Sequence, residues 1–287
     1  LVSDPIDQAG VDILSQVAQV DQRPGLSPEE LVSVIGDYDG LMIRSGTQVT
    51  AEVIAAASKL KIIGRAGVGV DNVDVPAATQ RGVLVVNSPE GNTIAAAEHA
   101  LAMMLSLSRH VPQAHAGMRT GKWDRKKYVG NELYKKTLGV VGLGKIGSHV
   151  ARVARAMGME VIAYDPFIAA DRAQQMQVRL TELDELFRTA DYVTLHIPRT
   201  KDTENLVNAE LLRTMKPTAR IVNCARGGVV DEAAIAEAIN SGVIAGAGLD
   251  VYASEPLAED SPLRAVERGL VLTPPLGAST EEAQENV

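Results

Sequence analysis

The 287-residue sequence has little of several features that would mark particular classes of protein. Its single cysteine, Cys224, excludes an internal disulfide framework and is typical of a reducing compartment such as the cytoplasm. Its apolar stretches are interrupted by glycine, arginine or histidine before they reach the length of a membrane span, and no signal peptide is recognisable. The formal net charge is −8 without a basic tail, which argues against nucleic acid and anionic membranes as partners. We therefore expect a globular cytoplasmic protein.

The pattern of apolar residues predicts an α/β fold. Hydrophobic residues make up 46% of the chain, which suits about two domains that each bury a core. Short apolar runs alternate with segments of helical periodicity, and this alternation is typical of βαβ units and parallel sheets. The predicted strands are 41–43, 61–63, 83–86, 138–141, 161–164, 192–195, 220–223, 245–249 and 270–273. The clearest helical segments are 28–35, 51–57, 94–109, 146–157 and 232–241.

The most informative segment runs from Leu138 to Asp165, LGVVGLGKIGSHVARVARAMGMEVIAYD. Gly142, Gly144 and Gly147 form a GxGxxG pattern between an apolar run and an amphipathic helix. In such a turn the first glycine permits the bend, the second lets the backbone approach a pyrophosphate, and the third lets helix and strand pack closely. Asp165 follows Gly147 by 18 residues, where a carboxylate can accept hydrogen bonds from the adenosine ribose and would repel a 2′-phosphate. The segment therefore predicts binding of NAD rather than NADP.

This motif begins only at residue 138, so a complete α/β unit with four or five strands is expected before it. We predict an NAD-binding Rossmann domain, residues 90–275, inserted into a substrate domain, residues 1–89 and 276–287. Both are expected to be doubly wound parallel sheets, the substrate domain flavodoxin-like. We expect the substrate domain to be truncated at both ends, because residues 1–4 read as the end of a strand. Near the other end, Ser279 and Glu282 form a capping box for a helix that has barely begun at Val287.

Polar residues at strand ends mark a candidate site, because ligands of doubly wound sheets bind beyond the carboxyl ends of the strands. Arg226 follows an apolar strand and precedes two glycines, where a guanidinium could hold a carboxylate bidentately. Glu255 follows the next strand end. Cys224 ends a buried strand, where we expect it to line the cofactor site, and no base is evident that would make it a nucleophile. Residues 71–74 lack the pattern of a calcium loop, so we predict no metal site.

Six segments carry a resemblance to a known family: GRAGVGVDNVD, NSPEGNT, VVGLGKIG, NCARGGVVDE, GLDVYASEP and TPPLGAST. Together they resemble the D-isomer-specific 2-hydroxyacid dehydrogenases over essentially the whole chain. Within that family the resemblance is strongest to the members that oxidise D-3-phosphoglycerate to 3-phosphohydroxypyruvate with NAD, the first step of serine biosynthesis. It implies two α/β domains with the active site in the cleft between them. It also implies a homodimer or higher homo-oligomer joined through the nucleotide domains.

The resemblance implies three catalytic positions, and one of them departs from the family. Arg226 matches the arginine that orients the 2-oxo acid and polarises its carbonyl. Glu255 matches a glutamate that tunes the pKa of a catalytic histidine. That histidine stands in a Thr-Pro-His-Leu-Gly motif, but here its place is taken by Pro275, which has no titratable group. We expect intact NAD binding and turnover lowered by roughly 10²–10⁴-fold, unless water or Glu255 substitutes as the acid.

The family's binding positions carry over as two sets. The cofactor-binding set is Val68, Gly142, Gly144, Lys145, Ile146, Gly147, Asp165, Ile197, Pro198, Cys224, Ala225, Arg226, Asp250, Gly277 and Ala278. The substrate-binding set is Arg44, Arg65, Gly67, Val68, Gly69 and Arg125. Arg125 and Lys126 either reach a neighbouring subunit's active site or form a solvated surface. We expect His99, His110 and His115 to be packing or surface residues and His196 to make a structural hydrogen bond.

Two other functions stay open at this point. Another D-2-hydroxyacid dehydrogenase, acting on glycerate or glyoxylate, would share most of these motifs. Some relatives of this fold are NAD-sensing transcriptional corepressors, and the loss of the histidine makes a non-catalytic NAD-binding protein conceivable. Retention of Arg226 and Glu255 argues against that reading.

Overall fold

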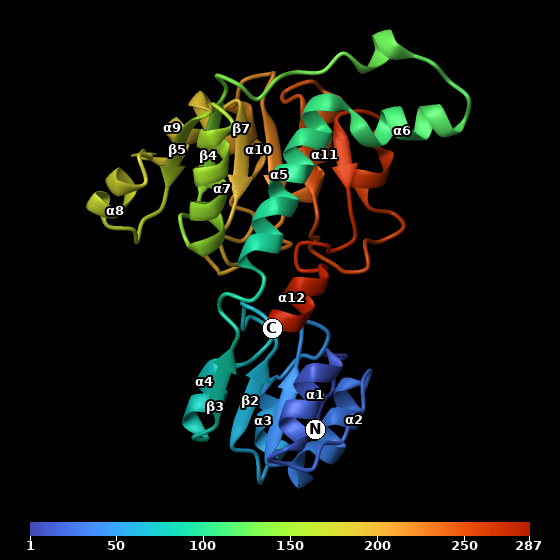
Figure 1. The fold of residues 1–287 in the computed structure, drawn as a ribbon, viewed down its shortest axis with the longest axis vertical. Helices are drawn as coiled ribbons and strands as arrows, with labels where there is room; N and C mark the ends of the chain where they lie inside the picture. The colour runs from blue at the N-terminus through green and yellow to red at the C-terminus, as the bar shows by residue number, and fades with distance from the viewer. The chain divides into compact units, whose positions relative to one another are not determined.

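The computed structural model describes residues 1–287, which form two compact units (Figure 1). Unit 1 comprises Leu1–Thr93 and Ala278–Val287, and unit 2 comprises Ile94–Gly277. The predicted boundaries, after residues 89 and 275, lie a few residues earlier in the chain. In chain order, unit 2 is inserted into unit 1.

Unit 1 contains a three-stranded parallel sheet with the order β1-β2-β3. Its strands are β1 (Gly40–Ile43), β2 (Ile62–Arg65) and β3 (Leu84–Asn87). Its helices are α1 (Gln8–Ser15), α2 (Pro28–Val34), η1 (Ile35–Asp37), α3 (Ala51–Ala56), α4 (Val75–Gln80) and α12 (Glu281–Asn286). The expectation of four or five strands is wrong. The segments around Val2 and Gln22 join the sheet only through single-residue bridges, from Val2 to Met42 and to Gln22.

The core of unit 1 lies on one face of this sheet. Leu41, Ile43 and Ile63 are buried there, against apolar residues of α2, α3 and α4. Local signals define the helix ends: Ser27 and Glu30 form a capping box at the start of α2. The last helix, α12, begins one residue later than predicted, because Thr280 rather than Ser279 accepts the capping hydrogen bond.

Unit 2 contains a seven-stranded parallel sheet with the order β10-β9-β8-β7-β4-β5-β6. Its strands are β4 (Thr137–Val141), β5 (Glu160–Tyr164), β6 (Arg179–Leu180), β7 (Tyr192–Leu195), β8 (Arg220–Asn223), β9 (Gly246–Leu249) and β10 (Leu270–Leu272). Its longer helices are α5 (Thr93–Arg109), α6 (Val111–Arg119), α7 (Lys145–Ala156), α9 (Leu183–Thr189) and α11 (Glu232–Asn240). The shorter ones are η2 (Arg125–Tyr128), α8 (Ala170–Gln175), α10 (Ala209–Arg213) and η3 (Pro262–Ala265).

The seven-stranded sheet is covered on both faces, as a doubly wound fold requires. One apolar cluster joins α5 and α7 to the sheet, and a second joins α9, α10 and α11 to the opposite face. The strand order reverses between β4 and β7, which is the switch point where doubly wound sheets bind ligands. The predicted α/β fold class with two parallel sheets is therefore confirmed, and unit 2 has the predicted doubly wound arrangement. No helix is both long enough and apolar enough to cross a membrane.

Candidate functional site

The glycine turn joins β4 to α7 beside the switch point. Gly142 has a φ of 94°, in the left-handed region that favours glycine, and its N–H donates to the Tyr164 carbonyl at 2.8 Å. A Cβ on Gly147 would lie 1.9 Å from the Gly142 carbonyl oxygen. The backbone of α7 therefore packs directly against the backbone of the turn. Gly144 is exposed, and a Cβ there would find no atom within 4 Å. The turn is tightly packed on the protein side and open at Gly144.

Asp165 connects this turn to the loop after β5. Its Oδ2 accepts a hydrogen bond from the Leu143 N–H at 2.7 Å. Its Oδ1 accepts from the N–H groups of Phe167 and Ile168 at 2.9 and 3.2 Å. Sequence reasoning missed this structural role, although Oδ2 keeps a lone pair for a ribose hydroxyl. Phe167, which lies next to the carboxylate in this loop, is 95% exposed.

These features fit a dinucleotide. The N–H groups at the start of a helix and its macrodipole attract a pyrophosphate, and the open space at Gly144 leaves room for one. Lys145 begins α7 and is exposed, whereas Ile146 packs against the core. The carboxylate of Asp165 lies within hydrogen-bond distance of the same turn. NAD is therefore compatible with this edge of the sheet.

The end of β7 borders the glycine turn from the other side. A Cβ on Gly142 would lie 2.5 Å from the His196 carbonyl oxygen and 2.9 Å from Ile197 Cγ2. His196 Nε2 lies 2.9 Å from Thr194 Oγ1, which confirms the structural hydrogen bond predicted for it. Burial lowers the pKa of His196 to about 4, so the imidazole is neutral near pH 7. Pro198 follows on the exposed side of this loop.

Arg226 lies in a loop that Asn223 holds in place at the end of β8. The buried Asn223 side chain accepts from the Ala225 N–H at 3.1 Å and donates to the Arg226 carbonyl at 2.9 Å. The half-buried Arg226 donates from Nη1 to the Ala225 carbonyl at 2.7 Å. Gly227 leaves no room for a side chain, since a Cβ would lie 1.6 Å from the Tyr252 carbonyl oxygen. The Arg226 loop therefore packs directly on the loop after β9.

Tyr252 ties that second loop to the end of β10. Its hydroxyl lies 2.7 Å from the Thr273 carbonyl oxygen and 3.0 Å from that of Leu249. Its N–H donates to Glu255 Oε1 at 3.1 Å, and Glu255 itself is exposed. Burial, reinforced by Asp250, raises the pKa of Tyr252 to about 12, so its hydroxyl stays a donor. The loops after β8, β9 and β10 thus converge within unit 2.

Asp250 holds the turn that carries Pro275. The residue is 1% exposed, and its Oδ1 accepts from the Thr273 hydroxyl at 2.6 Å and the Leu276 N–H at 2.9 Å. Its Oδ2 accepts from the Gly277 N–H at 2.9 Å. Pro275 is exposed between these contacts and offers no group for proton transfer.

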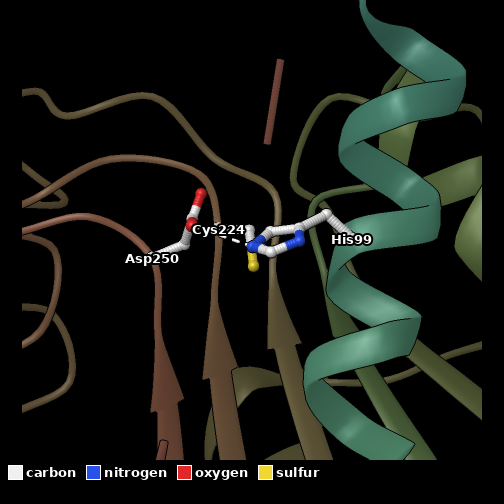
Figure 2. Close-up of side chains that lie close together, drawn as sticks. All are labelled: His99, Cys224 and Asp250. Atoms are coloured by element: carbon white, nitrogen blue, oxygen red, sulfur yellow. Dashed lines mark hydrogen bonds and ion pairs between the residues drawn. The ribbon is translucent and has the colours of Figure 1, made fainter. Parts of the chain in front are cut away.

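His99 is partly buried, as expected of a packing residue, but it also makes a specific polar contact that was not predicted. His99 Nε2 lies 2.8 Å from Asp250 Oδ1, and Cys224 lies beside the imidazole (Figure 2). Helical spacing could have shown this, since residue 99 stands between the buried Ala96 and Met103 on one face of α5. Burial and the Asp250 carboxylate raise the pKa of the Cys224 thiol far above its usual range. The thiol is therefore protonated and a poor nucleophile.

Two predicted substrate residues lie at strand ends in unit 1. Arg44 follows β1, donates from Nη1 to Gln284 Oε1 at 2.7 Å and lines a pocket beside α12. Arg65 ends β2 and folds back on the chain, with its Nη1 3.3 Å from the Ala66 carbonyl oxygen. That guanidinium fills the space where a Cβ of Gly67 would lie, and Gly67 has a φ of 142°. The φ of Gly67 favours glycine at this position, whereas the guanidinium is the end of a flexible side chain that can move.

The remaining predicted residues differ in their surroundings. The Val68 carbonyl accepts from Asn87 Nδ2 at 2.6 Å, and Gly69 follows in the same loop. Asn72, from the segment considered for calcium, donates to the carbonyls of Arg44 and Thr47. Arg125 begins η2 and is exposed, as is Lys126. Contact of any of these residues with a substrate stays a prediction.

A comparison with protein families identifies unit 2. The model of the D-isomer specific 2-hydroxyacid dehydrogenase, NAD binding domain, matches residues 101–277. The D-3-phosphoglycerate dehydrogenase of Synechocystis sp. is 63% identical over 287 residues, which is 100% of this chain and 51% of that protein. The enzyme of the same name from Archaeoglobus fulgidus is 50% identical over 288 residues, with 100% and 54% covered. The chain thus spans about half the length of the curated relatives it matches.

Solved structures resemble the whole chain. The TT0316 protein from Thermus thermophilus is 36% identical with a TM-score of 0.91, and the match covers 99% of this chain and 91% of that one. A D-lactate dehydrogenase from Aquifex aeolicus, solved with NAD and lactic acid, is 27% identical with a TM-score of 0.88, covering 99% and 91%.

Proposed function

The chain belongs to the D-isomer specific 2-hydroxyacid dehydrogenase family, and from this premise we propose that it oxidises D-3-phosphoglycerate to 3-phosphohydroxypyruvate with NAD. The product would enter serine biosynthesis. The observation that carries the proposal is the 63% identity, over the whole chain, to a relative named for this reaction. Because the chain spans about half of that relative, the proposal concerns the reaction and not its regulation.

The proposal assigns some residues to binding of the cofactor and others to binding of the substrate. Gly144 and the start of α7 bind the pyrophosphate, and Asp165 binds the adenosine ribose. NAD, when bound, accepts the hydride that leaves the substrate. Arg226 holds the substrate carboxylate bidentately and polarises the oxygen of the reacting carbon. In unit 1, Arg44 and Arg65 provide the positive charge for the phosphate group of the substrate.

Proton transfer is the weak step in this chain. The substrate hydroxyl must lose a proton as the hydride leaves, and Pro275 cannot accept one. Glu255 is held by the Tyr252 N–H at 3.1 Å, which orients its carboxylate within the loop. Without a titratable group at position 275 the contribution of general acid–base catalysis is lost, and turnover is lower by about 10²–10⁴-fold than with a histidine there. NAD binding does not depend on this group and remains intact.

Steady-state oxidation of 3-phosphoglycerate, measured through NADH formation, tests the proposal. The unchanged chain is compared with Pro275→His, and Pro274→His adds the same imidazole one residue away as a matched control. We expect Pro275→His to raise kcat by about 100-fold or more, with an unchanged dissociation constant for NADH, and Pro274→His to have little effect. No oxidation by any of the three chains would refute the proposed substrate, and equal kcat values would refute the role of position 275.

Another 2-hydroxy acid is the second candidate, because a solved structure of similar fold is a D-lactate dehydrogenase. A substrate panel separates the two. 3-Phosphoglycerate, glycerate and lactate differ in whether a phosphate is present, and glyoxylate tests the reverse direction. We expect the highest kcat/KM with 3-phosphoglycerate, since Arg44 and Arg65 are retained. A chain that binds NADH but acts on none of them would instead support a non-catalytic NAD-sensing protein.

A homodimer or higher homo-oligomer formed through unit 2 is part of the proposal. Exposed apolar side chains are concentrated in α6 and the segment that follows it: Val111, Met118, Trp123, Val129 and Tyr134. Light scattering coupled to gel filtration measures the mass. Trp123 is the sole tryptophan and 80% exposed in one chain, so its emission should shift to shorter wavelength as the oligomer forms. A monomer at micromolar concentration would refute this part.

The cytoplasm is the proposed location. The support is the single cysteine, which is typical of a reducing compartment. Fractionation of cells with an antibody to the chain checks it, and recovery in an organelle fraction would contradict it.

A further inference from the structure

Asp250 accepts four hydrogen bonds in the interior of unit 2. Three donors belong to the segment that carries Pro275: the Thr273 hydroxyl and the N–H groups of Leu276 and Gly277. The fourth donor, His99, comes from α5. A buried carboxylate depends on its donors, because each one that is lost leaves charge without solvation. The geometry of the segment is thus linked to a residue far away in the sequence.

The position of His99 suits this role. Its side chain is 18% exposed, whereas that of Asp250 is 2% exposed. Nε2 lies 2.8 Å from Asp250 Oδ1 and 3.5 Å from Thr273 Oγ1. Since an ionised carboxylate oxygen only accepts, the proton of this bond lies on Nε2. Figure 2 shows the imidazole reaching from α5 toward Asp250.

The cluster of His99, Cys224 and Asp250 is better described as a hydrogen-bond network than as a metal site. The three residues each offer a ligand atom, and these atoms lie within 4.8 Å of one another. The 2.8 Å contact between His99 and Asp250 is a hydrogen-bond length, and Asp250 Oδ1 already accepts three hydrogen bonds. A metal would also require the Cys224 thiolate, which burial disfavours.

We propose that His99 is a positioning residue for the cofactor site, acting through Asp250. Its N–H fixes the carboxylate so that Oδ1 and Oδ2 hold the amides of Leu276 and Gly277. The backbone on both sides of position 275 then has one conformation. The Gly277 N–H donates to Asp250 Oδ2 at 2.9 Å, so a shift of the carboxylate displaces the backbone of a residue in the predicted cofactor-binding set.

Two variants that differ only in reach test the inference. The amide nitrogen of His99→Gln can occupy the place of Nε2, whereas that of His99→Asn stops short of Asp250. We expect the NADH dissociation constant, measured by NADH fluorescence, to rise by less than about threefold in His99→Gln and by about tenfold in His99→Asn. His115→Asn, on the exposed side of α6, is the control and should bind as the unchanged chain does.

A second measurement separates positioning from packing, and this arm rests on the proposed function. If His99 fixes the turn, Pro275→His should gain about tenfold less kcat in the His99→Asn background than in the unchanged chain. The gain should be restored in His99→Gln. Equal NADH affinity in the two His99 variants, or an equal gain in all backgrounds, would overturn the inference. If no chain oxidises 3-phosphoglycerate, the proposed function fails, and the NADH titration still decides the role of His99.

Discussion

Two glycines of the turn after β4 have opposite surroundings, so the same substitution should have opposite effects at the two positions. In Gly147→Ala the new Cβ meets the Gly142 carbonyl oxygen at 1.9 Å and Val140 Cγ1 at 3.3 Å. In Gly144→Ala the new Cβ meets nothing within 4 Å, and the φ of −64° suits alanine. One position is constrained by packing of the protein, and the other is open in the structure and adjoins the predicted pyrophosphate.

The magnitudes follow from these contacts. The clash at Gly147 is with backbone, which no rotamer change relieves, so α7 must move away from β4 at a cost of about 3 kcal/mol. For a unit of this size that lowers the Tm by roughly 6–12 °C. In Gly144→Ala, the weaker helix N-cap and the restricted unfolded chain nearly cancel, which leaves stability within about 1 kcal/mol. The new methyl group occupies the open space predicted for the pyrophosphate and moves the phosphate away from its N–H donors. A loss worth one charged hydrogen bond should raise the NADH dissociation constant by about 10–100-fold.

Thermal unfolding and calorimetric titration with NADH measure the Tm and the NADH dissociation constant on the same samples. Gly10→Ala in α1 of unit 1 is the control, since its Cβ would make an ordinary contact at 3.6 Å with Ile6. That variant should change neither the Tm of unit 2 nor NADH affinity. The reasoning is refuted if Gly144→Ala binds NADH as tightly as the unchanged chain, or if it loses as much stability as Gly147→Ala.

Most strands of unit 2 could be predicted because they are buried on both faces. All residues of β7 and β9 are buried, so these strands appear in the sequence as short runs without charged residues. The two-residue strand β6, Arg179–Leu180, has no such run and was missed. The segment around Val2, predicted as a strand end, pairs with its neighbours through one residue only. The periodicity of apolar residues identifies strands and helices that pack against a core. It does not identify strands that are defined only by backbone pairing with a neighbouring strand.

The candidate site was predicted in part, since some of its contacts join distant segments. Arg226 and Glu255 stand in motifs at strand ends, and their neighbours Asn223 and Tyr252 could have been noticed there. The bond between His99 and Asp250 joins residues 151 positions apart, and it exists because α5 packs on the sheet. No local sequence pattern indicates that these two residues are in contact. The periodicity of α5 could place His99 near its buried face but could not name the carboxylate that it meets.

Three further predictions concern side chains around the same edge of the sheet. Phe167→Ala should leave the Tm unchanged, because the ring is 95% exposed, and should weaken NADH binding by about threefold in calorimetry if the ring covers the adenine. Tyr252→Phe should lower the free energy of unfolding in urea by about 1–2 kcal/mol, because the carbonyls of Leu249 and Thr273 lose their donor; a smaller loss would mean that water replaces it. His196 should make the protein less stable in acid. Its pKa is lowered to about 4 by burial, so between pH 6.5 and 4 the unfolded chain binds a proton that the folded chain does not. The free energy of unfolding should therefore fall with pH through this window, by about 2 kcal/mol at pH 5. His196→Gln, whose amide can still pair with Thr194, should lack this part of the pH dependence. The free energy of unfolding in urea is measured for both chains between pH 7 and 5. If it falls with pH equally in both, His196 is protonated in the folded protein.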